Sequence, residues 1–336
     1  MPAESPTPET AGDYIRMLDE IPGWFTALDA RLLIGVDDLQ KQRGTTGDLL
    51  EIGVYMGKSA ILLGYLPRHA ESLIVCDVFG EVGGLEEENV NESATWYSGL
   101  RRGAFESQFL RFHRALPTVW QMPSTSIDRA ERAGTCRLIH VDGAHTYEAV
   151  REDIATARAL LGPGGVAVFD DWATPHAVGV HVALWEEFLR GDLRLLCLSP
   201  LKLYATWDPA GLRREDVEGW VESQPDLDSS GLYHLAHGEV RLVTVATPAP
   251  EGSLSDPAKP PVPDSIESAT APLPDPAKPP VPDPTESATA PLQVPPARRS
   301  SRRPVRGIVR QIAPPILLTG YRRLRAVYRS RRGASQ

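Results

Sequence analysis

Hydrophobic residues recur in short blocks along the first 247 residues of the chain. The blocks expected to form strands are residues 49–54, 73–78, 119–122, 138–141, 166–169, 193–198 and 201–206. Between most of them, apolar residues follow helical spacing, at 58–66, 94–112, 146–161 and 177–190. Apolar strands that alternate with amphipathic helices predict an α/β fold, in which helices cover both faces of a mainly parallel sheet.

The end of the predicted sheet differs from the rest. Only Ser199 and Pro200 join its last two strands, which is too short for a parallel crossover, so this pair should be antiparallel. We therefore expect a doubly wound, mainly parallel seven-stranded sheet with an antiparallel terminal hairpin. A helix near 213–223 and a second hairpin, 233–237 with 240–245, should close the domain at about residue 247.

Helical spacing also covers residues 13–40, with a break at Pro22-Gly23. We expect these helices to form a cap on a domain that spans residues 13–247. A disordered N-terminus at 1–12 should precede it.

The composition changes after residue 247. Residues 248–297 contain one Pro-rich unit twice, at 256–264 and 275–283, and nothing in them can form a core, so we expect a disordered linker. The tail at 298–336 is basic and amphipathic: residues 297–336 hold 12 arginines and no acid, with isoleucine, leucine and valine between them. The formal charge of −9 therefore hides an acidic body, whose 23 basic and 44 acidic residues give −21.

Cysteine usage and the chain ends bear on the compartment. Cys76, Cys136 and Cys197 lie in or beside apolar strands without metal-ligand spacing, and we interpret them as buried, reduced thiols. The N-terminus lacks the features of a secretory signal, and no apolar run approaches the ~20 residues of a membrane-spanning helix. These features predict a cytoplasmic protein.

A strand, a glycine turn and a helix start follow one another at 48–59. Gly53 and Gly57 let the backbone turn tightly and approach a ligand closely, although a plain strand-to-helix turn would also explain them. The spacing matches neither a G-x-G-x-x-G dinucleotide fingerprint nor a P-loop.

Asp77 ends the next strand, where an acid can bind both ribose hydroxyls of an adenosine cofactor; a solvated strand end is the alternative.

Three acids follow two further strands, at the edge where an open parallel sheet keeps its active site. Asp142, Asp170 and Asp171 supply carboxylates, the ligands that Mg²⁺ or another divalent ion such as Mn²⁺ prefers. Such an ion could lower the pKa of a substrate hydroxyl. Adjacent acids after a strand are often only solvated loop residues, but Asp142 on a separate strand end favours a metal site.

Histidines lie close to these acids. His145 comes three residues after Asp142 and is the candidate general base, because imidazole titrates near neutral pH; a helix N-cap neighbour and a metal ligand are the alternatives. We interpret His140 as structural, and His176 and His181 as surface residues.

Four segments together resemble class I S-adenosylmethionine-dependent methyltransferases. They are Glu51-x-Gly53-x-x-x-Gly57-x-Ser59, Val141-Asp142-Gly-x-His145-x-Tyr147-Glu148-x-Val150-x-x-Asp153, Leu161-x-Pro163-Gly164-Gly165 and Phe169-Asp170-Asp171. The most similar group contains sugar O-methyltransferases of the macrocin and mycinamicin type, also labelled cephalosporin hydroxylase-like. The resemblance covers about residues 20–207.

This resemblance implies a Rossmann-like fold with S-adenosylmethionine at the glycine turn. The implied cofactor contacts are Glu51, Gly53, Gly57, Ser59, Asp77, Ser124 and Asp142. It also implies a divalent ion at Asp142, Asp170 and Asp171, and catalysis by His145 and Asp142. The chain departs from its relatives in two places: residues 54–56 replace a further glycine, and the lysine base and asparagine ligand of catechol-type enzymes are absent, which favours a sugar or aliphatic hydroxyl.

The sequence thus predicts a divalent-metal-assisted O-methyltransferase acting on a hydroxyl of a sugar, glycan or glycosylated small molecule. The alternative is a noncatalytic adenosine-cofactor-binding module that recruits partners through its basic tail; the missing fingerprint disfavours a nicotinamide oxidoreductase.

The tail resembles basic segments of glycan-assembly enzymes. Its composition suits an anionic membrane surface or a partner protein better than nucleic acid, because it lacks an aromatic stacking platform. We also expect peripheral attachment to the inner face of a membrane through residues 298–332, and a homo-oligomer of undetermined size.

Overall fold

The computed structural model of the chain describes residues 8–80 and 101–246. Its helices are α1 (Ala11–Ile15), η1 (Leu18–Glu20), α2 (Ala27–Gln42), α3 (Lys58–Leu63), α5 (Arg102–Phe109), η2 (Ser124–Ser126), α6 (Tyr147–Leu160), α7 (Val178–Leu189) and α8 (Arg214–Glu222). Its strands are β1 (Asp48–Ile52), β2 (Leu73–Cys76), β3 (Thr118–Trp120), β4 (Cys136–Val141), β5 (Leu161–Phe169), β6 (Arg194–Leu198), β7 (Leu203–Thr206), β8 (Leu227–Leu235) and β9 (Gly238–Val245). The expected linker and basic tail lie outside the described residues, as do part of the expected N-terminus and residues 94–100 of the predicted helix at 94–112.

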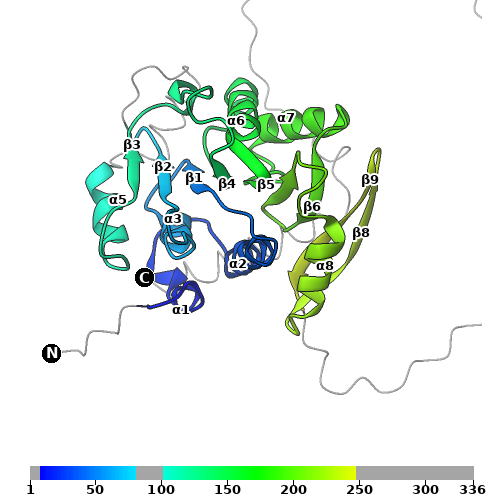
Figure 1. The fold of residues 1–336 in the computed structure, drawn as a ribbon, viewed down its shortest axis with the longest axis horizontal. Helices are drawn as coiled ribbons and strands as arrows, with labels where there is room; N and C mark the ends of the chain where they lie inside the picture. The colour runs from blue at the N-terminus through cyan, green and yellow to red at the C-terminus, as the bar shows by residue number, and fades with distance from the viewer. Residues whose placement is uncertain (1–7, 81–100, 247–336) are drawn as a thin grey trace, which may run out of the picture. The chain divides into compact units, whose positions relative to one another are not determined.

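All these strands form one mixed sheet, in the order β3-β2-β1-β4-β5-β7-β6-β9-β8 (Figure 1). Strands β1 to β5 pair in parallel, and β7 runs antiparallel to both β5 and β6. The predicted doubly wound fold with a terminal antiparallel pair is therefore confirmed. The β8–β9 hairpin extends the expected seven strands to nine, because Leu242 of β9 pairs with Leu198 of β6.

Alternation along the strands divides the apolar side chains between two cores. Leu49 and Leu138 face the core that α1, α2, α3, α5 and α8 cover, whereas Leu50 and Ile139 face the core beneath α6 and α7. Helices on both faces explain why these strands are apolar throughout. The three cysteines are buried and free, as expected.

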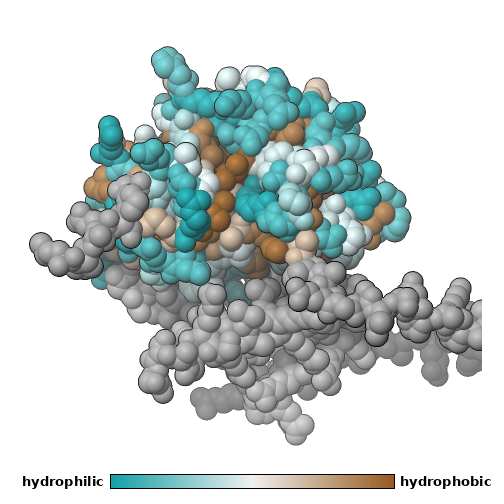
Figure 2. Space-filling model, turned by 90° about the horizontal axis from the view of Figure 1, so that it is seen from below, coloured by the Kyte–Doolittle hydropathy of each residue, from teal (hydrophilic) through white to brown (hydrophobic). Residues whose placement is uncertain are grey.

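The surface of the described region mixes polar and apolar areas. Seen from below the view of Figure 1, a band of hydrophobic residues lies between hydrophilic areas (Figure 2). Exposed apolar area of this kind is common on folded proteins and by itself assigns no partner. Among residues 8–80 and 101–246, no helix has the length and apolar character needed to cross a membrane.

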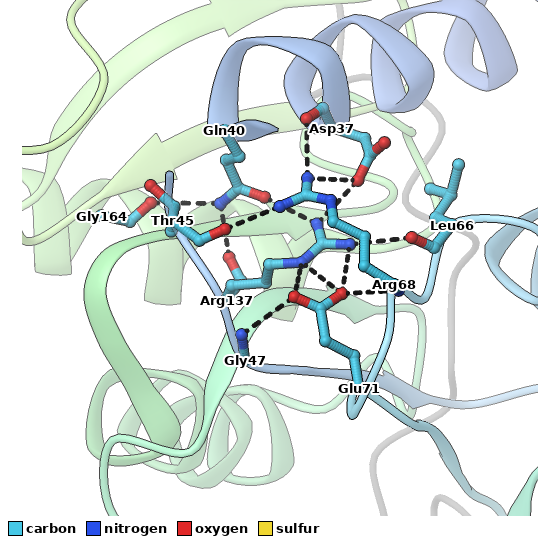
Figure 3. A network of polar contacts seen from close by, with 9 residues as sticks. All are labelled: Asp37, Gln40, Thr45, Gly47, Leu66, Arg68, Glu71, Arg137 and Gly164. Carbon is cyan, nitrogen blue, oxygen red and sulfur yellow. Dashed lines mark hydrogen bonds and ion pairs between the residues drawn. The ribbon is translucent and has the colours of Figure 1, made fainter. Parts of the chain in front are cut away.

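A buried polar network fixes α2 to the amino end of the sheet (Figure 3). The Arg137 side chain is fully buried at the start of β4, and its guanidinium lies 2.9 Å from a carboxylate oxygen of Asp37 and 3.0 Å from one of Glu71. It also donates hydrogen bonds to the Gln40 side chain and to the carbonyl of Leu66, each at 3.0 Å. Asp37 and Gln40 lie near the C-terminal end of α2. The network therefore fixes this end of the helix and so determines where its N-terminal end lies.

Candidate functional site

The candidate site lies at the carboxyl ends of β1, β4 and β5. Strands β2 and β3 lie on one side of β1, and β4 and β5 lie on its other side. The order in which the chain adds strands therefore reverses between β1 and β4. Open α/β sheets bind ligands at such a switch point. Asp142 follows β4 and Asp170 follows β5; their amides donate to Ile52 (2.8 Å) and Val141 (2.9 Å), which extends the ladder and holds both acids at this edge.

The structure brings Asp142 and Asp170 together, with ligand atoms within 4.8 Å of each other and of His140. Lys202, which directly precedes β7, points into this group from the side. Its side chain is fully buried, and Nζ lies 2.6 Å from Oδ2 of Asp170. Its ammonium also lies 5.4 Å from the centre of the Phe25 ring. The two acids therefore share one internal cation.

Burial and charge act against each other in this group. Burial raises the pKa of Asp142 well above its usual value, and the neighbouring Asp170 raises it further. Burial alone would lower the pKa of Lys202, but Asp170 and Asp142 outweigh it, so the pKa lies above its ordinary value. The contact with Asp170 therefore favours the ammonium form of Lys202.

The backbone holds Lys202 in this position. The turn at 199–202 closes through two hydrogen bonds: the Ser199 amide donates to the Lys202 carbonyl, and the Lys202 amide donates to the Ser199 hydroxyl, both at 2.8 Å. That hydroxyl in turn donates to Asp29 of α2 at 2.6 Å. Asp29 is buried and also accepts from the hydroxyl of Tyr204 at 3.2 Å. Asp29, near the N-terminal end of α2, therefore holds the turn that carries Lys202 through the Ser199 hydroxyl.

A divalent ion at Asp142 and Asp170 does not fit this arrangement. The Lys202 ammonium already contacts Asp170, and the third expected ligand, Asp171, lies in a separate group with His145 and His176. Two unit charges ~4 Å apart interact by ~4 kcal/mol at an effective dielectric constant of about 20, and an ammonium repels a divalent ion about twice as strongly. We therefore assign no chemical step to a metal ion.

Asp171 pairs with the candidate base. Its backbone has a positive φ of 59°, and its carboxylate lies with His145 and His176, in a different group from that of Asp170. Oδ2 of Asp171 lies 3.2 Å from Nε2 of His145, and Oδ1 accepts a hydrogen bond from the Thr174 hydroxyl. Burial would raise the pKa of Asp171, but the bonds from His145 and Thr174 lower it overall. An ionised carboxylate beside an imidazole can orient the ring and stabilise its protonated form.

A small hollow connects the imidazole with the acid pair. Asp142, His145 and Asp170 line it together with apolar side chains, including those of Phe169 and Val180. The predicted catalytic residues His145 and Asp142 thus border one space. The rings of His145 and His176 are 5.7 Å apart. His181 is partly buried, in contrast to its interpretation as a surface residue, and burial lowers its pKa.

The glycine turn requires its two glycines. Gly53 has a φ of 82°, and a Cβ there would lie 1.9 Å from the Asp142 carbonyl oxygen. Gly57 has a φ of 86°, and a Cβ there would lie 2.8 Å from the Phe105 ring. The first glycine therefore lets the β1 turn pack directly on the Asp142 loop.

Asp77 organises the backbone of this turn. Its carboxylate accepts hydrogen bonds from the amides of Val54 (2.7 Å), Tyr55 (3.1 Å) and Phe79 (2.6 Å). Burial raises its pKa, and these bonds oppose the increase. A carboxylate has about four acceptor positions, so about one remains for a ribose hydroxyl. The turn and this acid fit an adenosine-containing cofactor.

Two other residues implied as cofactor contacts bond to side chains of the protein itself. Glu51 is fully buried, accepts a hydrogen bond from Ser59, and lies 2.8 Å from Nδ1 of His140. Burial raises the pKa of Glu51 to about 8 and lowers that of His140 well below its ordinary value. The interpretation of His140 as structural agrees with these contacts. Ser124 lies in η2, where its side chain bonds to the buried Asp153.

Sequence reasoning missed Lys202 and Asp29. A single lysine inside the apolar run 201–206 was a signal, because lysine is rarely fully buried unless it is paired. The sequence signal for Asp29 is its position three residues after Thr26, whose hydroxyl caps α2. Neither pattern shows which distant segment each residue meets.

The fold defines the class: a Rossmann-like domain with a glycine turn after β1 and an acid after β2. Residues 50–172 match the model of a family described as "Methyltransferase domain". This match covers the turn and Asp142, His145, Asp170 and Asp171, and confirms the resemblance to class I S-adenosylmethionine-dependent methyltransferases. Residues 50–172 are therefore similar to a methyltransferase domain.

Solved structures with a similar arrangement include three enzymes. The O-methyltransferase NovP is 16% identical, covering 52% of this chain and 78% of its own, with a TM-score of 0.43. CalS11, a TDP-rhamnose 3'-O-methyltransferase of calicheamicin biosynthesis, is 19% identical, covering 61% and 88%, with a TM-score of 0.38. MycE of the mycinamycin pathway, in complex with Mg and SAH, is 18% identical, covering 62% and 58%, with a TM-score of 0.37. Among curated proteins, no sequence matches this chain.

Proposed function

We propose that this protein is an S-adenosylmethionine-dependent O-methyltransferase in which His145, oriented by Asp171, removes the proton of an acceptor hydroxyl. The observation that carries the proposal is the 3.2 Å contact between Nε2 of His145 and Oδ2 of Asp171, beside a hollow at the switch point of the sheet. The residue motifs of the sugar O-methyltransferase group support a sugar, glycan or glycosylated small molecule as acceptor.

Each group has a defined task in this mechanism. S-adenosylmethionine, when bound, supplies a methyl group on a positively charged sulfur that leaves as a neutral thioether. The acceptor oxygen forms the new bond to the methyl carbon, and its proton passes to His145. Asp171 stabilises the resulting imidazolium, as the acid of a catalytic dyad does. The turn at Gly53 and the carboxylate of Asp77 would hold the cofactor, and alignment of the reacting atoms supplies much of the rate.

The sequence also predicted assistance by a divalent ion at Asp142, Asp170 and Asp171. The mechanism proposed here includes no such step, because Lys202 contacts Asp170 and Asp171 pairs with His145. Asp142 instead lines the hollow, and its carbonyl packs against the glycine turn.

The test combines cofactor binding with methyl transfer. Calorimetry should detect S-adenosylmethionine binding and no NAD⁺ binding, and labelled methyl should pass to glycosides or nucleotide sugars with free hydroxyls. His145→Ala should lower kcat by roughly 10²–10⁴-fold, the usual contribution of a general base, with an unchanged cofactor Kd. His234→Ala is the control, because the His234 side chain is 75% exposed and pairs with Glu239 of the same hairpin.

Two outcomes would overturn the proposal. Binding of NAD⁺ in place of the methyl donor would exclude the cofactor class. Cofactor binding without turnover on any hydroxylated sugar would favour a noncatalytic binding module.

A further inference from the structure

We infer that the ammonium of Lys202 is the built-in cation of the Asp142–Asp170 pair, so that this site binds its cofactor and acts without a divalent ion. The inference concerns the site of the proposed function, but its primary test measures metal binding rather than turnover. The two proposals can therefore fail separately.

The contacts of Lys202 carry this inference. Its side chain has no exposed surface, and Nζ lies 2.6 Å from Oδ2 of Asp170. Leu203 of β7 pairs with Phe169 of β5, and the two strands are antiparallel. Lys202, which precedes Leu203, is therefore brought opposite Asp170, which follows Phe169. Strand register, and not a flexible side chain alone, therefore brings the ammonium to Asp170.

The lysine also has little room to leave. Reciprocal hydrogen bonds between Ser199 and Lys202 close the turn that carries it, and Asp29 holds the Ser199 hydroxyl from the α2 side. Phe25 covers the ammonium from the N-terminal cap. A mobile surface lysine could withdraw when a metal ion arrived, but this one is enclosed by three segments of the fold.

The remaining expected ligand is engaged elsewhere. Asp171 contacts His145 and Thr174 and lies in a different group of side chains from Asp170. A metal ion held by all three acids would need both the displacement of a buried ammonium and the rotation of Asp171. Two carboxyl groups so close together disfavour each other's ionised form. The positive charge of Lys202 opposes this effect in the interior.

This assigns Lys202 a positioning role. Lys202 holds Asp170 directly, and its charge acts on the neighbouring Asp142, whose carbonyl packs against the Gly53 turn without space for a Cβ. The inference therefore predicts that the affinity for S-adenosylmethionine is the same with chelator and with divalent ion, whereas loss of the lysine should weaken cofactor binding and open a cation position.

The experiment titrates Mn²⁺ into the metal-stripped full chain and follows the free aqueous ion by electron paramagnetic resonance. Wild type should bind Mn²⁺ no more tightly than Asp170→Asn, whereas Lys202→Gln should gain one site per chain. The double variant with Asp170→Asn should lose that site again. Lys41→Gln, at an exposed lysine of α2, is the matched control and should behave as wild type.

Several results would contradict the inference. One Mn²⁺ bound per wild-type chain and abolished by Asp170→Asn would show a true metal site, as would a tenfold loss of S-adenosylmethionine affinity on chelation. A folded Lys202→Gln variant without new Mn²⁺ binding would show that the ammonium does not occupy a cation position. If Lys202→Gln does not fold, the comparison of wild type with Asp170→Asn still decides.

Discussion

Replacement of Arg137 by methionine would remove the guanidinium that joins α2 to the amino end of the sheet (Figure 3). In the folded protein this group is completely buried between the carboxylates of Asp37 and Glu71, and it donates hydrogen bonds to Gln40 and to the Leu66 carbonyl. Methionine fills the space of the aliphatic stem but offers no donor. The variant therefore leaves a buried carboxylate and a buried carbonyl with fewer partners.

The expected loss of stability is large. Removal of one partner from a buried ion pair costs about 3–5 kcal/mol, because the other charge stays buried without compensation. Glu71 would retain only the amides of Gly47 and Arg68 as hydrogen-bond donors. Natural domains are stable by about 5–15 kcal/mol, so this loss is a considerable part of the total. For a domain of this size it corresponds to a fall in Tm of roughly 6–20 °C.

Urea unfolding followed by far-UV circular dichroism, together with thermal scans of the full chain, would measure this effect. Arg16→Met is the matched control: Arg16 is 74% exposed and pairs with Asp13, so its loss should cost less than about 1 kcal/mol. Glu71→Gln in the Arg137→Met background should recover part of the loss, because it removes the uncompensated charge. Equal stability of the two arginine variants, or no recovery in the double variant, would refute this reasoning.

Three further predictions concern the site and the tail. Gly53→Ala should destabilise the protein by more than about 1 kcal/mol and weaken S-adenosylmethionine binding, measured by thermal shift and calorimetry, because its φ is 82° and its Cβ would overlap the Asp142 carbonyl; unchanged affinity would contradict the packing described. Burial raises the folded-state pKa of Glu51 from 4.5 to about 8, so the folded state holds this proton more tightly than the unfolded state. The unfolding free energy should therefore fall as pH rises between about 5 and 8, and Glu51→Gln should flatten that slope in urea titrations; an unchanged slope would assign it to other groups. For the basic tail we propose an anionic surface as partner: deletion of residues 298–336 should abolish sedimentation with phosphatidylserine vesicles and leave the Tm of the domain unchanged, whereas retained sedimentation would exclude the tail.

Most of the fold could be predicted from local pattern. Apolar runs located each strand of the seven expected, and the two-residue link at Ser199-Pro200 established that β6 and β7 are antiparallel. The same pattern placed Asp142 and Asp170 at neighbouring strand ends, because parallel strands present their carboxyl ends at one edge. Local pattern could not predict the pairing of β9 with β6, because it does not indicate which edge of a sheet a hairpin joins.

The site itself depended on contacts between distant segments. Sequence spacing suggested that Asp170 and Asp171 act together, but in the structure their side chains belong to different groups, Asp170 with Asp142 and Asp171 with His145. Glu51 and Ser59 looked like cofactor contacts, yet strand alternation turns Glu51 toward the interior, where it meets His140 from a neighbouring strand.

By itself, the sequence determined the class of protein: strands and helices in an α/β order, a glycine turn with an acid one unit later, and a histidine three residues after the strand-end acid. These features follow from local rules of spacing and backbone conformation. Only the tertiary structure decided which charges meet. Lys202, Asp29 and Asp170 come from segments far apart in the chain, and their electrostatics depend on a burial and a distance that exist only after the core has packed.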